Sequence, residues 1–214
     1  MIFVQFFRWL VHSSNWGVVS TISTRSLPSS SSNKTDSTTP QSIPFGNIFS
    51  LSDGLCDPSS STGLPYLYAT DLDQTMQDVH ENPMISLTIS EASFAQNSKA
   101  CSTTGYFGDP ENPPCARLVL TGTFRKIASD QEMEFGREAL LSKHPSMKYW
   151  PLDHEFFVGT LEIEDLWMLD WFGGASILNV DDYFNIDLTL LEKEEEKLEF
   201  SFLQDIASFV RFGF

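Results

Sequence analysis

Hydrophobic and polar residues alternate in several short runs of the chain, and this period of two is typical of half-buried β-strands. The clearest run covers residues 115–126, where Leu118 and Leu120 point to one side and Arg117 and Thr121 to the other. Alternation of this kind favours an antiparallel sheet, because the strands of parallel sheets are buried on both faces. The same pattern predicts further strands at residues 15–23, 45–52, 66–69, 84–90 and 156–171.

Three segments beside these strands carry apolar residues at helical spacing, namely residues 2–13, 70–81 and 130–144. The last begins with a capping box at residues 129–132, in which serine and glutamate satisfy the first amide groups of a helix. It ends before Pro145, because proline cannot continue a helix. The strands and helices together predict a mainly β fold, an antiparallel β-barrel with peripheral helices.

The barrel pattern extends over residues 1–188, which we predict to be one domain, but two segments differ from it in composition. Residues 27–42 are rich in Ser and Thr and lack apolar periodicity, so we expect a flexible insertion. This insertion contains the only Asn-x-Ser/Thr sequence of the chain, at Asn33, which is a predicted glycosylation site. Residues 189–214 join an acidic run to apolar residues at helical spacing, and we expect an acidic linker and an amphipathic C-terminal helix.

The charge of the chain argues against two classes of partner. It has 214 residues and a net charge of −16 with only 13 Lys and Arg residues, which disfavours binding to nucleic acid or to an anionic membrane surface. No run of about eighteen or more apolar residues is present, so we predict no membrane-spanning helix. Arg8 interrupts the apolar N-terminus and no small-residue cleavage site follows, so we interpret this segment as a helix and see no signal peptide.

The three cysteines, Cys56, Cys101 and Cys115, contain no Cys-x-x-Cys pair and therefore offer no natural ligand set for structural zinc. Cys101 and Cys115 flank a loop rich in Gly and Pro, which a disulfide would close in an oxidising compartment. Two unpaired thiols are the alternative, and the residues alone leave both open. Cys56 lies in a loop with Ser and Pro and is expected to be a surface thiol without a role.

No catalytic or metal site is expected from the histidines. His12, His144 and His154 have no spacing that would place two of them on one helical face, and no His-Glu-x-x-His sequence is present. His144 precedes Pro145 at the predicted end of a helix, where a packing or capping role is favoured.

Several blocks of the sequence resemble the CREG family of cellular-repressor glycoproteins, in the order of that family and over most of the chain. The most specific block runs from His144 to Asp187. The residues that carry the resemblance are Trp16-Gly17 with Thr21-Ile22-Ser23; Phe49-Ser50-Leu51-Ser52-Asp53-Gly54 with Gly63-x-Pro65-Tyr66-x-Tyr68 and Glu81-Asn82-Pro83; and His144-Pro145-x-Met147-Lys148-x-Trp150-Pro151 with Trp167-x-Leu169-Asp170-x-Phe172-Gly173-Gly174 and Tyr183-x-Asn185.

The resemblance implies an FMN-binding split-barrel-like fold, similar to the pyridoxamine-phosphate oxidase and flavin-reductase group. Such barrels usually form two-fold dimers, so a homodimer is implied as well. We place its interface on the segment Trp167, Leu169, Trp171, Phe172, Gly173 and Gly174. Family members look like relatives that lost the flavin, and they are secreted or endolysosomal glycoproteins. The resemblance therefore implies the secretory pathway for this chain, in an extracellular, endolysosomal or vacuolar location.

A flavin site would need cations and hydroxyl groups that converge on the dianionic phosphate. The candidates lie on several predicted strands: Thr21, Ser23 and Arg25, with Thr88, Ser90 and Lys126 elsewhere. We favour the simpler interpretation that alternating Ser and Thr form the exposed face of a strand, because cations are few. No cofactor is therefore predicted, and FMN is the disfavoured alternative.

These observations predict a non-catalytic binding or signalling protein on a split-barrel scaffold. The resemblance associates it with growth or differentiation control or with endolysosomal or vacuolar function, through a protein partner or receptor that the sequence does not identify. The alternative is a flavin- or haem-handling oxidoreductase on the same scaffold.

Overall fold

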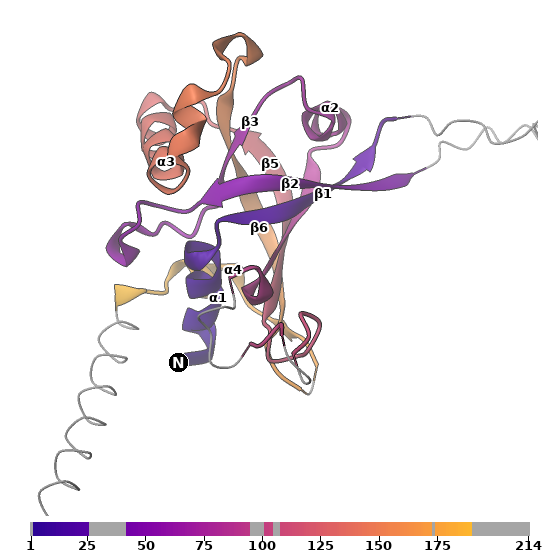
Figure 1. Cartoon of the computed structure of the whole chain (residues 1–214), viewed down its shortest axis with the longest axis vertical. Helices are drawn as coiled ribbons and strands as arrows, with labels where there is room; N and C mark the ends of the chain where they lie inside the picture. The colour runs from indigo at the N-terminus through magenta and orange to yellow at the C-terminus, as the bar shows by residue number, and fades with distance from the viewer. Residues whose placement is uncertain (1, 26–41, 95–100, 105–107, 173, 190–214) are drawn as a thin grey trace, which may run out of the picture.

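The β-strands form a closed antiparallel barrel in this computed structural model, which describes residues 2–25, 42–94, 101–104, 108–172 and 174–189 (Figure 1). Within these residues six strands follow the order β3-β2-β1-β4-β5-β6, and pairing of β3 with β6 closes the barrel, while a short β7 lies beside β6. The bounds are Trp16–Ser23 (β1), Ile43–Ser52 (β2), Tyr66–Ala69 (β3), Met84–Ser90 (β4), Arg117–Lys126 (β5), Phe157–Leu169 (β6) and Ser176–Ile177 (β7). The predicted mainly β, antiparallel barrel is confirmed.

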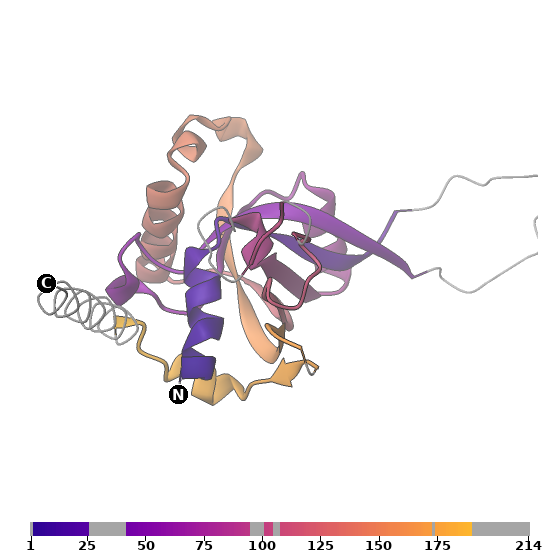
Figure 2. The ribbon, with the colours of Figure 1, turned by 60° about the horizontal axis from the view of Figure 1, so that its bottom comes forward.

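Helices surround the barrel. α1 (Ile2–Ser13) and α4 (Val180–Phe184) lie side by side at one end, whereas α3 (Asp130–Lys143) packs outside, beside β2 and β3 (Figures 1 and 2). α2 (Gln74–Glu81) packs on β1. Short 3₁₀ turns occur at Pro58–Ser60, Glu91–Ser93, Pro145–Tyr149 and Leu152–His154. None of the helices in the described part of the chain is long and apolar enough to cross a membrane.

The hydrophobic core fills the barrel and continues under the helices. Alternate residues of β4 and β5, such as Leu87, Leu118 and Leu120, are fully buried inside the barrel, and α1 adds Phe7 and Leu10 at its end. A second cluster lies between α3 and the outer face of the barrel. Its buried members are Tyr66, Ile127, Ala139, Leu140, Met147 and Val158. The period of two in the strands therefore buries one face, as the sequence pattern predicts.

The β5–β6 pair contains an irregularity that only glycine accommodates. The register of the two strands shifts between Thr121 and Gly122, as in a β-bulge. A Cβ atom at Gly122 would lie 1.9 Å from the carbonyl oxygen of Glu162, which is far inside van der Waals contact. A side chain at this position would therefore push the two strands apart.

Most predicted elements have their counterpart in the structure, with small differences at the ends. The helix predicted at 130–144 ends one residue earlier. Ser129 Oγ accepts the Glu132 amide, which is one half of the predicted capping box, whereas the Glu132 carboxylate binds Arg125. The helix predicted at 70–81 begins only at Gln74, because the Asp73 side chain caps the Thr75 amide at 2.7 Å. The strand predicted at 156–171 is shorter at both ends. The insertion with Asn33 and the C-terminal linker and helix lie outside the described residues.

Candidate functional site

The hydroxyl groups at the end of β1 surround a buried carboxylate, that of Asp78 on α2. Thr21 Oγ1 donates to Asp78 Oδ2 at 2.8 Å, and the Thr24 amide and hydroxyl donate to Oδ1 at 2.7 and 2.9 Å. Gln74 Nε2 donates to the same oxygen at 2.7 Å. Burial alone would raise the pKa of Asp78, but these hydrogen bonds outweigh burial and hold the pKa below its usual value. Asp78 is therefore an ionised carboxylate.

Of the predicted flavin-phosphate candidates at the end of β1, Thr21 binds the Asp78 carboxylate, whereas Ser23 and Arg25 bind each other. Ser23 Oγ accepts the Arg25 amide at 3.2 Å and Arg25 Nε at 3.3 Å, and the guanidinium lies 4.7 Å above the ring of Phe45. A phosphate dianion beside Asp78 would be repelled by the carboxylate, which already takes the hydroxyl donors that a phosphate would need. The arrangement is better suited to joining β1 to α2 than to holding a phosphate.

One part of the sequence interpretation is wrong at this site. Thr21 and Ser23 are not on the exposed face of a strand, because their exposed fractions are only 5% and 6%. The other candidates lie elsewhere. Ser90 Oγ accepts the Ala92 amide at the turn after β4, and Lys126 lies at the end of β5 over the ring of Phe157.

A second buried carboxylate, Asp53, joins residues from distant parts of the chain at the α1 end of the barrel. Its Oδ1 lies 2.7 Å from His12 Nδ1 of α1, and its Oδ2 accepts the hydroxyl of Ser61. Lys143 Nζ, at the end of α3, donates to the carbonyl oxygens of His12 and Ser14. Burial alone would raise the pKa of Asp53, but His12, Ser61 and the nearby Lys143 charge outweigh it and lower the pKa below its usual value of 3.8.

Arg8 extends this network to α4. Its guanidinium donates to the carbonyl and hydroxyl oxygens of Ser61 at 2.8 and 2.9 Å and stacks on the Tyr183 ring at 5.3 Å. The Tyr183 hydroxyl, in a fully buried side chain, donates to the Gly63 carbonyl at 2.7 Å. Gly63 has a φ of 78°, and a Cβ there would lie 2.7 Å from the Arg8 guanidinium, so glycine is required. Three residues of the family-like blocks, Asp53, Gly63 and Tyr183, thus meet in one network.

The order of groups in this network does not suit nucleophilic catalysis. A serine nucleophile needs the imidazole between its hydroxyl and the carboxylate, whereas here Asp53 lies between Ser61 and His12. Asp53 is fully buried and His12 nearly so, which leaves no room for a substrate. We interpret the network as a structural connection between α1, α4 and the loop after β2.

The other two histidines considered in the sequence analysis, His144 and His154, make capping and packing contacts. His144 ends α3 with its amide on the Leu140 carbonyl, and its Nε2–H donates to the Leu51 carbonyl at 3.0 Å. It therefore caps the helix and ties it to β2. His154 contacts the ring of Phe156. No group of three or more potential metal ligands occurs among the residues that the structure describes.

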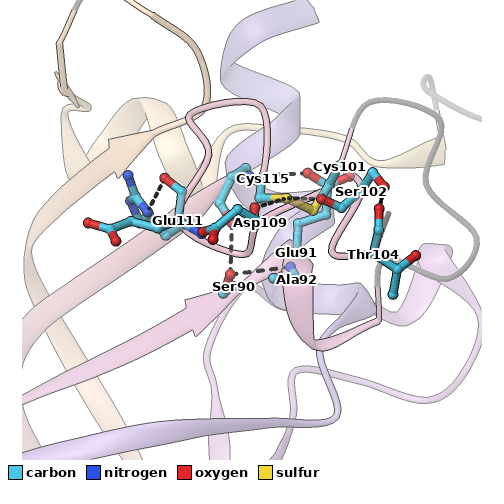
Figure 3. The surroundings of a disulfide bond; sticks show 11 residues. Ser90, Glu91, Ala92, Cys101, Ser102, Thr104, Asp109, Glu111 and Cys115 are labelled. Carbon is cyan, nitrogen blue, oxygen red and sulfur yellow. Dashed lines mark hydrogen bonds between the residues drawn. A yellow bond between two sulfur atoms is a disulfide. The ribbon is translucent and has the colours of Figure 1, made fainter. Parts of the chain in front are cut away.

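A disulfide joins Cys101 and Cys115, so the structure has the bonded form of the two alternatives left open by the sequence. Both cysteines are fully buried, beneath the turn at Glu91 and Ala92 (Figure 3). The Glu91 amide donates to the Ala116 carbonyl at 2.8 Å, and the Ala116 amide donates back to the Glu91 carboxylate. The disulfide and these bonds fix the start of β5. Cys56 is a free, exposed thiol.

Removing this disulfide is expected to destabilise the fold. Replacing both Cys101 and Cys115 with Ser should lower the free energy of unfolding by about 2–4 kcal/mol, because the unfolded chain loses a cross-link. Denaturant titrations of the oxidised wild type and the double variant measure the difference. Cys56→Ser is the matched control and should leave the midpoint unchanged; equal stabilities of wild type and double variant would contradict the expected role.

The predicted dimer segment carries exposed aromatic rings at the end of β6. Trp167 and Leu169 are half-buried, whereas Trp171 and Phe172 are 60% and 68% exposed. Ile177 of β7, which pairs with Trp167, is 74% exposed and extends the apolar surface. Gly174 is exposed with a φ of 114°, and residue 173 lies outside the described part. The surface has the composition of an interface core, and the dimer stays a prediction.

Comparisons with known proteins agree on one family and one fold. The family model described as "CREG, beta-barrel" matches residues 4–185. "Protein CREG1" of Gallus gallus is 35% identical over 179 residues, covering 84% of this chain and 83% of that protein, and "Protein CREG1" of Homo sapiens is 34% identical, covering 84% and 72%.

Among solved structures, a heme binding protein from Mycobacterium smegmatis has a TM-score of 0.60 at 19% identity. The match covers 85% of this chain but only 59% of that one. A protein of the pyridoxinephosphate oxidase family from Clostridium acetobutylicum has a TM-score of 0.51 at 13% identity, with coverages of 85% and 97%. At these identities the likeness concerns the fold, which is that of the split barrels.

Proposed function

Because this chain belongs to the CREG family, we propose that it is a non-catalytic binding or signalling protein on a split-barrel scaffold. It acts through its surface, on a protein partner or receptor, in growth or differentiation control or in endolysosomal or vacuolar function. It needs no bound flavin or haem for this role.

The observation that carries this proposal is the Asp78 carboxylate beside Thr21, one of the hydroxyl groups considered for a flavin phosphate. Thr21 and Thr24 donate to Asp78 rather than to an external anion. A cofactor phosphate at this position would bring two negative charges against a third in a largely buried place. The buried Asp53 network likewise has the features of a structural connection rather than of a catalytic group.

The competing function, a flavin- or haem-handling oxidoreductase, is suggested by the similar folds of a heme binding protein and of a protein of the pyridoxinephosphate oxidase family. Visible absorbance of the freshly purified protein separates the two. We expect a colourless protein both as isolated and after incubation with haem and gel filtration. A flavin or haem band that co-elutes with the protein in an equimolar ratio would contradict the proposal.

We further propose that the protein passes through the secretory pathway. The buried Cys101–Cys115 disulfide is of the kind that persists in oxidising compartments, and the family resemblance implies the same route. Fractionation of cells that produce the protein from its own gene should find it in the lumen of this pathway or in the medium. Recovery in the reducing cytosol, with both cysteines as free thiols, would contradict this location.

The homodimer is proposed to form through the exposed surface of Trp171, Phe172 and Ile177. Replacing Trp171 and Phe172 together with Ser should convert a dimer into a folded monomer, because these side chains are exposed in the single chain. Light scattering at micromolar concentration measures the mass. Tyr149→Ser, at an 87% exposed aromatic residue elsewhere, is the control and should leave the dimer intact. A monomeric wild type would overturn the proposal.

A further inference from the structure

A cleft of about 310 Å³ lies beside α2, between this helix and the ends of β5 and β6. Its volume is at the lower limit for small-molecule sites. Most of its lining is apolar: Met76, Val79, Pro83, Phe124 and Phe157. Three ionisable side chains, Asp71, His80 and Lys126, complete it.

Of the charged side chains that line the cleft, Lys126 has no carboxylate partner within the described residues. His80 Nε2 lies 3.1 Å from Asp71 Oδ1, so these two exposed side chains pair with each other. Lys126 Nζ lies 3.9 Å from the centre of the Phe157 ring. Within the described residues Lys126 has no ion pair with a carboxylate, although acidic residues outnumber basic ones by 29 to 13 in the chain. The aromatic face thus holds the ammonium at the cleft through a cation–π contact.

The cleft lies on the opposite side of α2 from Asp78 and its hydrogen-bond donors. Successive residues of a helix are rotated by about 100°, so Gln74 and Asp78 share one face of α2, and Met76 and His80 lie on the opposite face. The first face contacts the end of β1 and the second lines the cleft. The Asp78 charge therefore lies across the helix from a ligand in the cleft.

We propose that this cleft binds a small monocarboxylic acid with an apolar body. The Lys126 ammonium takes the carboxylate, and the accessible apolar side chains of Phe157 and Pro83 cover the aliphatic or aromatic body. The single Lys126 ammonium can neutralise one negative charge of a ligand, whereas a phosphate dianion needs several hydrogen-bond donors. The Asp71 carboxylate would also repel a second negative charge in the cleft. An amine ligand would meet Lys126 as a like charge.

Binding of phenylacetate and hexanoate to the full chain tests the proposal, with phenylacetamide as the uncharged match. Amide-resolved NMR titration reports both affinity and location. We expect saturable shifts at residues of α2 and at Lys126 with both acids, and affinity at least about tenfold weaker for phenylacetamide, because a charge-assisted hydrogen bond is lost. Equal binding of acid and amide, or saturable shifts elsewhere only, would overturn the proposal.

Substitutions at two exposed positions are expected to change the affinity for phenylacetate in opposite directions. Lys126→Met keeps the apolar stem and removes the charge, so it should weaken phenylacetate binding about tenfold or more. Asp71→Asn removes a negative charge from the cleft and should strengthen binding about two- to fivefold. Lys148→Met, at an exposed lysine outside the cleft, is the control and should leave the affinity unchanged.

If Lys126→Met has a native amide spectrum and binds phenylacetate with unchanged affinity, Lys126 does not bind the carboxylate. If phenethylamine binds more strongly than phenylacetate, the cleft does not select carboxylic acids. These outcomes are independent of the proposed cofactor-free function, because flavin or haem absorbance does not depend on the occupancy of this cleft.

Discussion

Replacing Asp53 with Asn is expected to lower the free energy of unfolding by about 3–5 kcal/mol, because removing one partner of a buried charge network leaves the others uncompensated. Asp53 is fully buried, and its carboxylate faces the His12 ring, the Ser61 hydroxyl and the nearby Lys143 charge. Urea titration at neutral pH measures the loss. Asp153→Asn, at an exposed carboxylate, is the control and should not move the midpoint.

The pH dependence of this effect follows from the lowered pKa of Asp53. A carboxyl group whose pKa is lower in the folded state stabilises the fold above its unfolded pKa of 3.8, and this contribution disappears as pH falls through the folded pKa. The difference between wild type and Asp53→Asn should therefore persist from neutral pH to about pH 5 and shrink only below about pH 4. A difference that vanishes between pH 7 and pH 5 would contradict the ionised network.

The second large effect is expected at Tyr183. Tyr183→Ala should lower the free energy of unfolding by about 3–5 kcal/mol, because it opens a cavity at a fully buried ring that also stacks on Arg8. Tyr183→Phe should cost about 1–3 kcal/mol, since only the hydrogen bond to the Gly63 carbonyl is lost.

Phe184→Ala provides the matched control for Tyr183, because Phe184 is the next residue but is 38% exposed. Chemical denaturation of the three variants should rank Tyr183→Ala as the least stable and Phe184→Ala as the closest to wild type. A Tyr183→Ala protein as stable as Phe184→Ala would show that α4 is not anchored by this ring.

Much of the barrel could be predicted because its strands are long enough to display their period. In β4 the buried residues Ile85, Leu87 and Ile89 alternate with half-buried polar ones, so the predicted and observed ends coincide. β7 has two residues and α4 has five, and neither length contains enough repeats for a period to be visible. Their positions depend on contacts with β6 and α1, which a local pattern does not contain.

The candidate site was harder to predict, because the decisive residue has no local signal. Asp78 looks in the sequence like any acidic residue of a surface helix, and only the fold brings it to Thr21, 57 positions earlier. The spacing of Gln74 and Asp78 by one helical turn was the sole hint of a polar face. For the same reason the local pattern places Thr21 and Ser23 on an exposed face, although both are buried in the structure, where α2 packs on β1.

The sequence blocks that resemble the CREG family also show that a local pattern does not reveal which residues meet in the fold. Asp53, Gly63 and Tyr183 could be recognised as part of a resemblance, but their common role needed the contacts of Arg8 and Ser61. A buried polar network of this kind is specified by the partners that satisfy it rather than by spacing along the chain.

Titrating the folded wild-type protein with FMN and recording flavin fluorescence tests the proposal that Asp78 keeps a flavin phosphate away from the end of β1. We expect no saturable quenching, because the hydroxyl groups of Thr21 and Thr24 are already bound to a carboxylate. Saturable quenching that ends at an equimolar complex would contradict it.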